Sequence, residues 1–204
     1  MTQTQARFIA LWSRSGGSRA EAVCADLAQR YAEPARRYHT LQHVRRCLRD
    51  FDRARDEIPH PDAVELALWC HDVIYAPGAR DNEQRSASWF RQWADGRIAA
   101  SECICDMILA TRHTNAPAGL DERFACDIDL AVLGASRSLF RRDGERLRAE
   151  RPDLDDRAYD QHERALLGGL LARPRIYLTD FFHTRCETRA RSNLTWRLDL
   201  PMAH

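Results

Sequence analysis

The stretch ALWCHDVIY, from Ala67 to Tyr75, places an adjacent imidazole and carboxylate, His71 and Asp72, between two apolar runs. Apolar residues on both sides predict that this pair is half-buried. A buried carboxylate is costly unless its charge is compensated, and a bound cation is a common compensation. The stretch alone is also consistent with a hydrogen bond between the two side chains at the end of a core helix.

Apolar residues on both sides of this stretch recur with the period of an α-helix, and no alternating run indicates a strand. We therefore predict an all-α helical bundle formed by residues 1–204 as one domain. The longer predicted helices cover residues 38–54, 64–75, 98–113, 124–133, 136–150, 155–172 and 187–198. Ser18 to Glu21 form a capping box that predicts the start of an earlier helix, and Asp81 is the predicted cap of another. Arg191 and Asn193 are expected to tie the last helix to the core.

The composition is that of an ordinary soluble protein, with 44% hydrophobic and 30% charged residues among 204. The net charge of +1 argues against a dedicated nucleic-acid-binding or membrane-surface protein. No segment has the pattern of a signal peptide or the length of a membrane span. The seven cysteines include no CxxC pair, which favours reduced, buried thiols. We therefore expect a cytoplasmic protein that binds neither nucleic acid nor a membrane.

Other histidines and aspartates could reach a shared site from separate predicted helices. His39 and His43 lie four residues apart and would share one helix face, a spacing common among metal ligands. His113 ends the run ILATRHT, and Asp127 and Asp129 lie in the run ACDIDLAVLG. Each also has a simpler explanation, because acids favour the start of a helix and histidine favours its end.

The predicted donors follow a fixed order along the chain, and each lies on a different predicted helix. The order is His43, the pair His71-Asp72, His113 and Asp129. Nitrogen and oxygen donors without thiolates suit Mn, Fe, Mg, Co or Ni better than structural zinc. This order resembles the HD superfamily of metal-dependent phosphohydrolases. The chain also resembles one bacterial family of predicted HD phosphohydrolases in successive blocks between Tyr38 and Leu194. These blocks are YHTLQHV, HDVIY, DNEQRSA, ILATRHT, DIDLAVLG and ETRARSNL.

The resemblance implies an α-helical HD fold in which several helices bind one divalent cation. The implied ligands are His43, His71, Asp72 and Asp129. Asp127 is the alternative to Asp129, which we prefer because an aspartate followed by leucine resembles the superfamily's equivalent position. The candidates for a second metal or for a phosphate contact are His39, His113 and Asp127.

The implied activity is hydrolysis of a small phosphorylated metabolite or nucleotide by a metal-activated water. Asp72 would bridge the metal and the water, and Glu83 would transfer a proton. Because all 31 basic residues are arginine, a guanidinium group must hold the phosphate, and Arg37 and Arg112 are the candidates.

Two other functions remain open at this point. Some HD-fold proteins carry a non-haem di-iron centre and act as oxygenases, and His39 and His113 could supply its second iron. A catalytically silent sensor that binds a nucleotide is the other alternative, although a binding module would not require the complete ligand set.

Overall fold

The computed structural model describes residues 2–202, which form ten α-helices and two 3₁₀ helices. No strand occurs between these two residues, so the all-α prediction is confirmed. The chain divides into two compact units, Met1–Asp129 and Leu130–His204. The prediction of one domain across the whole chain therefore stays a prediction. None of the described helices is long and apolar enough to cross a lipid bilayer.

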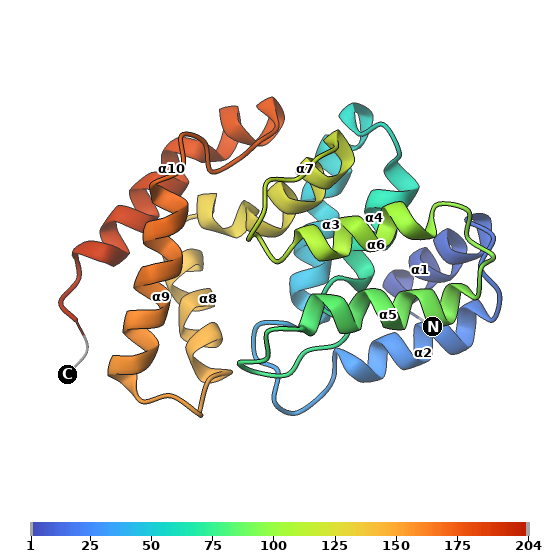
Figure 1. The fold of residues 1–204 in the computed structure, drawn as a ribbon, viewed down its shortest axis with the longest axis horizontal. Coiled ribbons are helices and arrows are strands. Elements are labelled where there is room, and N and C mark those ends of the chain that lie inside the picture. The colour runs from blue at the N-terminus through green and yellow to red at the C-terminus, as the bar shows by residue number, and fades with distance from the viewer. Residues whose placement is uncertain (1, 203–204) are drawn as a thin grey trace. The chain divides into compact units, whose positions relative to one another are not determined.

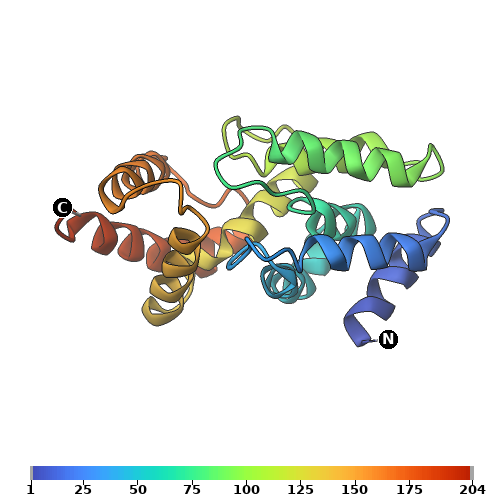
Figure 2. The same cartoon turned by 90° about the horizontal axis from the view of Figure 1, so that it is seen from below.

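Each unit contains its own set of helices (Figures 1 and 2). The first unit comprises α1 (Gln3–Arg14), α2 (Ala20–Arg30), α3 (Leu41–Ala54), η1 (Arg55–Glu57), α4 (Pro61–Cys70), α5 (Asn82–Ala94), α6 (Ser101–Ala110) and α7 (Leu120–Asp129). The second unit comprises η2 (Leu130–Gly134), α8 (Arg137–Ala149), α9 (Asp156–Leu171) and α10 (Asp180–Asp199).

Helix α4 lies at the centre of the first unit and packs against α1, α3, α5, α6 and α7 (Figure 1). Every residue from Ala63 to Cys70 is buried. The one charged residue of this run, Glu65, accepts a hydrogen bond of 2.7 Å from Nε of Arg7. A helix that is apolar on every side is stable only when neighbouring elements cover all of it. The central position of α4 follows from this composition.

Helix α4 ends at Cys70, five residues before the predicted end at Tyr75. The HD pair therefore lies in the turn that follows the helix, with His71 as the C-cap residue. A turn directs two adjacent side chains with more freedom than a helix, where successive residues diverge by roughly 100°. This local geometry allows His71 and Asp72 to face the same point.

Helix α3 begins at Leu41 rather than near Tyr38. The hydroxyl of Thr40 caps it and accepts a hydrogen bond of 3.2 Å from the backbone N–H of Gln42. The prediction that His39 and His43 share one helix face is wrong, because His39 precedes this cap.

The predicted capping box at Ser18 is also wrong. The N-cap of α2 is Arg19, which has a left-handed backbone with φ 54° and makes no side-chain capping bond. The carbonyl of Ser18 instead accepts a hydrogen bond of 2.9 Å from Nε1 of Trp12. Asp81 is the N-cap residue of α5, as predicted, but its side chain makes no capping hydrogen bond.

Helix α6 ends at Ala110, and His113 follows in a left-handed conformation with φ 58°. Helix α7 ends at Asp129, where the chain tightens into the 3₁₀ helix η2 instead of continuing as α-helix to Leu133. Both predicted helices were therefore too long at their C-terminal ends. Asp129 lies at the last position of α7 and of the first unit.

The second unit is organised by α10, which packs against η2 and α9 (Figure 2). This helix begins at Asp180, seven residues before the predicted start, because Thr179 caps it. As expected, Asn193 ties it to the core of its unit by donating to the carbonyls of Leu133, at 2.7 Å, and Ala135, at 3.0 Å. Gly134 approaches α10 so closely that a Cβ atom there would lie 2.8 Å from Cβ of Cys186.

Arg191 also anchors the C-terminal helix within the second unit. Its Nε atom donates to Oε1 of Glu187 at 2.7 Å, and its Nη atoms donate to backbone carbonyls between α9 and α10. Glu187 in turn accepts hydrogen bonds of 3.1 Å from the backbone N–H groups of Ile176 and Tyr177. The expected structural role of Arg191 is confirmed.

Candidate metal centre

Three elements of the first unit bring four predicted ligands to one point. His43 is the third residue of α3, His71 and Asp72 lie in the turn after α4, and Asp129 lies at the end of α7. We call His43, His71, Asp72 and Asp129 the donor cluster. The imidazoles are almost fully buried, with 3% and 1% of their side chains exposed, whereas the carboxylates are 15% and 17% exposed. The cluster therefore has a buried imidazole side and a carboxylate side that reaches solvent.

The donor atoms of the cluster lie at short and similar distances from one another. Nε2 of His43 lies 3.1 Å from Nε2 of His71 and 3.1 Å from Oδ1 of Asp129. Nε2 of His71 lies 2.9 Å from Oδ2 of Asp72 and 3.4 Å from Oδ1 of Asp129. The distance between Nε2 of His43 and Oδ2 of Asp72 is 3.5 Å.

These separations suit coordination of a common cation. Donor atoms about 2.1 Å from an ion lie roughly 3.0 Å apart in octahedral and roughly 3.4 Å apart in tetrahedral geometry. The observed range of 2.9 to 3.5 Å spans both values. His43, His71 and Asp72 form a group whose donor atoms all lie within 4.8 Å of one another. The residues present therefore fit a divalent cation with nitrogen and oxygen ligands.

The orientation of His71 is fixed by a backbone contact. Its Nδ1 atom lies 3.0 Å from the carbonyl oxygen of Leu68, an acceptor, so Nδ1 carries a proton that it donates. This contact directs Nε2 towards the carboxylates of Asp72 and Asp129. A backbone carbonyl in this role is typical of histidines that ligate metals, because it fixes both the tautomer and the ring plane.

Burial and charge act in opposite directions on the pKa values of the donor cluster. Burial disfavours a charged imidazole at His71, but the carboxylates of Asp72 and Asp129 outweigh it and raise the pKa of His71 well above its usual range. At His43 burial dominates and lowers the pKa, despite the hydrogen bond with Asp129. Burial also opposes ionisation of Asp72 and Asp129, yet the surrounding imidazoles hold the pKa of both carboxyls below the usual range. The donor cluster therefore favours two ionised carboxylates, which suits a bound cation.

The structure separates the two candidate aspartates. Asp129 approaches both imidazoles of the cluster, whereas Asp127 is buried and belongs to neither potential metal-binding group of the described residues. Side chains two positions apart in an α-helix differ in direction by roughly 200°. Asp127 and Asp129 have this spacing, so they cannot face the same point. The geometry thus favours Asp129 over Asp127, and the role of either as a ligand stays a prediction.

His113 contacts the cluster from outside it, and His39 lies beside it. Nε2 of His113 lies 2.9 Å from Oδ2 of Asp129, the carboxylate oxygen that does not face His43. The ring of His39 stacks on Tyr75, with 4.1 Å between ring centroids. Burial raises the pKa of Asp72, and the charges of His71 and then of His39 are among the influences that outweigh it.

Two of the predicted proton-transfer and phosphate-binding residues, Glu83 and Arg112, form a pair of their own rather than part of the cluster. Oε2 of Glu83 pairs with Nε of Arg112 at 3.5 Å, and Nη2 of Arg112 donates to the carbonyl of Arg80 at 2.9 Å. Arg37 is exposed and contacts the backbone carbonyls of Pro34 and Arg36. Among the interactions of the described residues, Glu83 and Arg112 therefore contact each other and backbone, and not the four donors.

A buried arginine that the sequence did not single out fixes the position of the HD pair. The guanidinium of Arg36 is fully buried and donates to the carbonyls of Asp72, at 2.6 Å, and Val73, at 2.9 Å. It also donates to the carbonyl of His39 at 3.1 Å. Arg36 thus joins the turn before α3 to the turn after α4. No sequence signal distinguishes it from the other arginines.

The backbone after the HD pair is held by two polar side chains of α5. Oγ of Ser86 accepts from the N–H of Ile74 at 3.1 Å and lies 3.2 Å from its carbonyl. The amide of Asn82 accepts from the N–H of Ala76 at 2.9 Å and donates to its carbonyl at 3.0 Å. Both side chains are buried, and together they fix the loop by acting as backbone substitutes.

A cysteine also lies at the cluster and was not predicted to do so. Sγ of Cys47 lies 3.6 Å from Nε2 of His43, one helical turn earlier on α3. Burial raises the pKa of the Cys47 thiol well above its usual value. The spacing of four residues from His43 was a usable signal, but the surrounding apolar residues favoured a core position for the cysteines.

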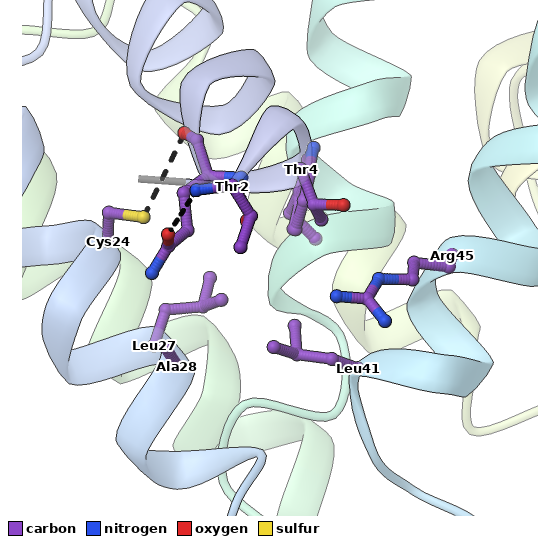
Figure 3. A pocket seen from close by; sticks show the side chains of 9 residues that line it. Thr2, Thr4, Cys24, Leu27, Ala28, Leu41 and Arg45 are labelled. Atoms are coloured by element: carbon purple, nitrogen blue, oxygen red, sulfur yellow. Dashed lines mark hydrogen bonds between the residues drawn. The ribbon is translucent and has the colours of Figure 1, made fainter.

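A cavity of about 110 Å³ in the first unit lies among α1, α2 and the start of α3. Figure 3 shows Leu27, Ala28 and Leu41 along it, with Cys24 on one side and Arg45 on the other. Its other lining residues are Thr2, Thr4, Gln5 and Trp69. None of these nine residues belongs to the donor cluster or to the predicted site, so the cavity is separate from the candidate metal centre.

Comparisons with protein-family models, with curated proteins and with solved structures found no match to this chain.

Proposed function

We propose that this protein is a divalent-cation-dependent phosphohydrolase of the HD type that acts on a small phosphorylated metabolite or nucleotide. The observation that carries the proposal is the convergence of two imidazoles and two carboxylates from three separate elements, with donor atoms 2.9 to 3.5 Å apart. The resemblance of the sequence blocks to HD phosphohydrolases supports the same reaction class.

The chain's own residues would divide the work between holding the cation and orienting the substrate. His43, His71, Asp72 and Asp129 would hold the cation, in that chain order. A divalent cation bound there would lower the pKa of a water molecule and neutralise charge on a phosphoryl oxygen. The 15% to 17% exposure of the two carboxylates indicates that substrate would approach from their side.

Proton transfer and phosphate orientation are assigned to groups outside the donor cluster. Glu83 is our candidate for proton transfer and Arg112 for the phosphate contact, and these two side chains already form an ion pair at 3.5 Å. A phosphate that engages Arg112 would compete with Glu83 for the guanidinium, which would leave the carboxylate available to accept a proton. Arg37 is the alternative phosphate ligand.

One observation favours a second candidate, an oxygen-dependent di-iron enzyme. The Asp129 carboxylate faces His43 with one oxygen, at 3.1 Å, and His113 with the other, at 2.9 Å. A carboxylate placed between two sets of imidazoles is the arrangement that a two-metal site requires. His39, whose ring stacks on Tyr75, is the further candidate ligand for such a site.

The test begins with the metal-free chain. Phosphomonoesters, nucleoside triphosphates and cyclic nucleotides are screened with Mn²⁺, Mg²⁺, Co²⁺ or Fe²⁺, and release of phosphate or pyrophosphate is measured. The proposal expects turnover in wild type and in Asp81→Ala, since Asp81 is exposed and makes no capping bond. Failure to hydrolyse any phosphoester, combined with two irons per chain and consumption of oxygen, would replace the phosphohydrolase with the oxygenase.

A further inference from the structure

Helix α3 presents two different donor atoms to the same region, one turn apart. His43 and Cys47 are both buried and lie at positions i and i+4, which share one helix face. Sγ of Cys47 lies 3.6 Å from Nε2 and 3.9 Å from Nδ1 of His43. The sulfur therefore lies near both ring nitrogens and slightly closer to Nε2, the nitrogen that faces the donor cluster.

Cys47 belongs to a second group of donors with different chemistry. His43, Cys47 and Asp129 offer one nitrogen, one sulfur and one oxygen, all within 4.8 Å of one another. Cys47 does not enter the group formed by His43, His71 and Asp72. The two groups overlap at His43, so a cation held by one would exclude a cation held by the other.

The distances suit a tetrahedral cation that binds sulfur. With a metal–sulfur distance of about 2.3 Å and a metal–nitrogen distance of about 2.1 Å, the two donors in a tetrahedral site lie roughly 3.6 Å apart. The observed distance between Sγ of Cys47 and Nε2 of His43 is 3.6 Å. A soft thiolate favours zinc over manganese or magnesium, which prefer oxygen and nitrogen ligands.

We propose that His43, Cys47 and Asp129 form a second coordination position for a thiophilic divalent cation, of which Zn²⁺ is the type. Binding replaces the S–H bond of Cys47 with a metal–sulfur bond, and the proton leaves to solvent, so no oxidant or reductant takes part. Occupation of this position excludes a cation from the His43, His71 and Asp72 position. The centre thereby discriminates between soft and hard cations by position as well as by affinity.

This inference uses two residues of the proposed hydrolytic centre but does not depend on hydrolysis. Cation binding can be measured on a chain that turns over no substrate. Hydrolysis without sulfur coordination would remove this inference and leave the proposed function intact. Sulfur coordination without hydrolysis would support this inference and contradict the proposed function.

The test is a titration of the metal-free full-length chain with Co²⁺ and with Cd²⁺ in a non-thiol reductant. Sulfur-to-metal charge-transfer absorption in the ultraviolet is the readout. We expect the band in wild type and its loss in Cys47→Ala. The matched control is Cys70→Ala, another buried cysteine, which belongs to neither donor group and should keep the band. His71→Ala should also keep it, because the second position does not use His71.

X-ray absorption of the Zn²⁺-loaded wild type gives an answer that needs no variant. One sulfur at about 2.3 Å is expected, together with nitrogen or oxygen neighbours. Cys47→Ser replaces Cys47→Ala if circular dichroism shows that the alanine variant does not fold. A zinc shell without sulfur, or a charge-transfer band that is undiminished in the Cys47 variant, would overturn the proposal.

Discussion

His71 makes contacts of two kinds, and their combination decides its charge. Its Nδ1–H donates to the carbonyl of Leu68 at 3.0 Å, while Nε2 lies 2.9 Å from Asp72. The raised pKa of His71 favours its protonated form, with a proton on Nε2, in the metal-free chain. A cation can bind at Nε2 only when that proton leaves.

Cation binding should therefore release a proton, and cation affinity should rise with pH. The affinity should increase as the pH approaches the raised pKa of His71 and level off above it, because neutral imidazole is the ligand. Calorimetric titration of the chain with Mn²⁺ in buffers of different ionisation enthalpy measures the released protons. The same titration of His71→Gln, which cannot carry this proton, is the control. A proton count of zero near pH 7 in wild type would contradict the prediction.

Asp72→Ala should affect turnover more than Glu83→Gln. Asp72 is proposed to hold the cation, so its loss removes water activation and charge neutralisation together. Glu83 is proposed only to transfer a proton, which typically accelerates a reaction 10²- to 10⁴-fold, or by about 3 to 5 kcal/mol in activation free energy. Steady-state rates on the best phosphoester measure both variants, and bound metal per chain is determined in parallel. Equal activity of wild type and Asp72→Ala would rule out this mechanism.

Individual donors could be predicted because each interrupts an apolar run. His71, Asp72 and Asp129 stand between residues that the core requires, so their polarity needed an explanation at the sequence level. Arg36 and Cys47 carried no such signal. Arginine is the only basic residue type here, and a cysteine in an apolar helix face is ordinary core. The role of Arg36 follows from tertiary distances alone, whereas the only sequence signal for Cys47 is its spacing of four residues from His43.

At the scale of elements, the turn before α3 and the turn after α4 are joined by one guanidinium. Arg36 donates to carbonyls on both sides, and these carbonyls belong to residues 39, 72 and 73. Packing joins the same turns, because the ring of His39 stacks on Tyr75. Their relative position therefore depends on hydrogen bonds as well as on packing.

Arg36→Met should lower the free energy of unfolding by about 1–3 kcal/mol, because it leaves buried carbonyl groups without their donor. It should also weaken cation binding, since Asp72 is no longer held against His71. Urea unfolding and calorimetric cation titration measure the two effects. The matched control is Arg37→Met, which removes the exposed neighbouring arginine. Similar stability and affinity in both variants would show that Arg36 does not position the site.

The elements themselves were largely predictable, whereas their ends were not. The run from Val64 to Cys70 predicted the central helix, because apolar residues on every side require burial. Its end at Cys70, the start of α3 after Thr40 and the left-handed His113 depend on hydrogen bonds to distant residues or on single caps. These helix ends place His71, Asp72 and His113 outside the helices. The sequence pattern had placed all three residues inside helices.

At the scale of the whole molecule, the apolar core should sustain the fold without a cation. Large side chains such as Trp12, Trp69 and Phe90 are fully buried in the first unit, and Tyr177 in the second. Small zinc domains, by contrast, obtain most of their folding free energy from the metal. Addition of EDTA should abolish phosphoester hydrolysis and leave the helical circular dichroism spectrum largely unchanged. Loss of helical signal on chelation would show that the metal is structural.

The second unit should have its own acid-sensitive interaction at Glu187. Burial opposes ionisation of this carboxyl, but backbone N–H groups of Ile176 and Tyr177 and the guanidinium of Arg191 outweigh it and lower its pKa. A lowered folded-state pKa stabilises the fold above the unfolded value of about 4.3 and is lost as the pH falls through the folded value. Glu187→Gln should therefore be less stable than wild type at pH 7. The difference in denaturation midpoint should shrink as the medium becomes acidic, and a difference independent of pH would contradict this assignment.

The position of Asp129 at the end of α7 also sets an order of events during synthesis. Chains emerge from the N-terminus, so His43, His71 and Asp72 are available well before Asp129. A nascent chain that lacks α7 holds only three of the four donors, and it cannot complete either coordination position that uses Asp129. A cation therefore cannot reach its full set of four ligands while only the early helices of the first unit have formed. Its tight binding would instead mark the moment at which α7 has docked.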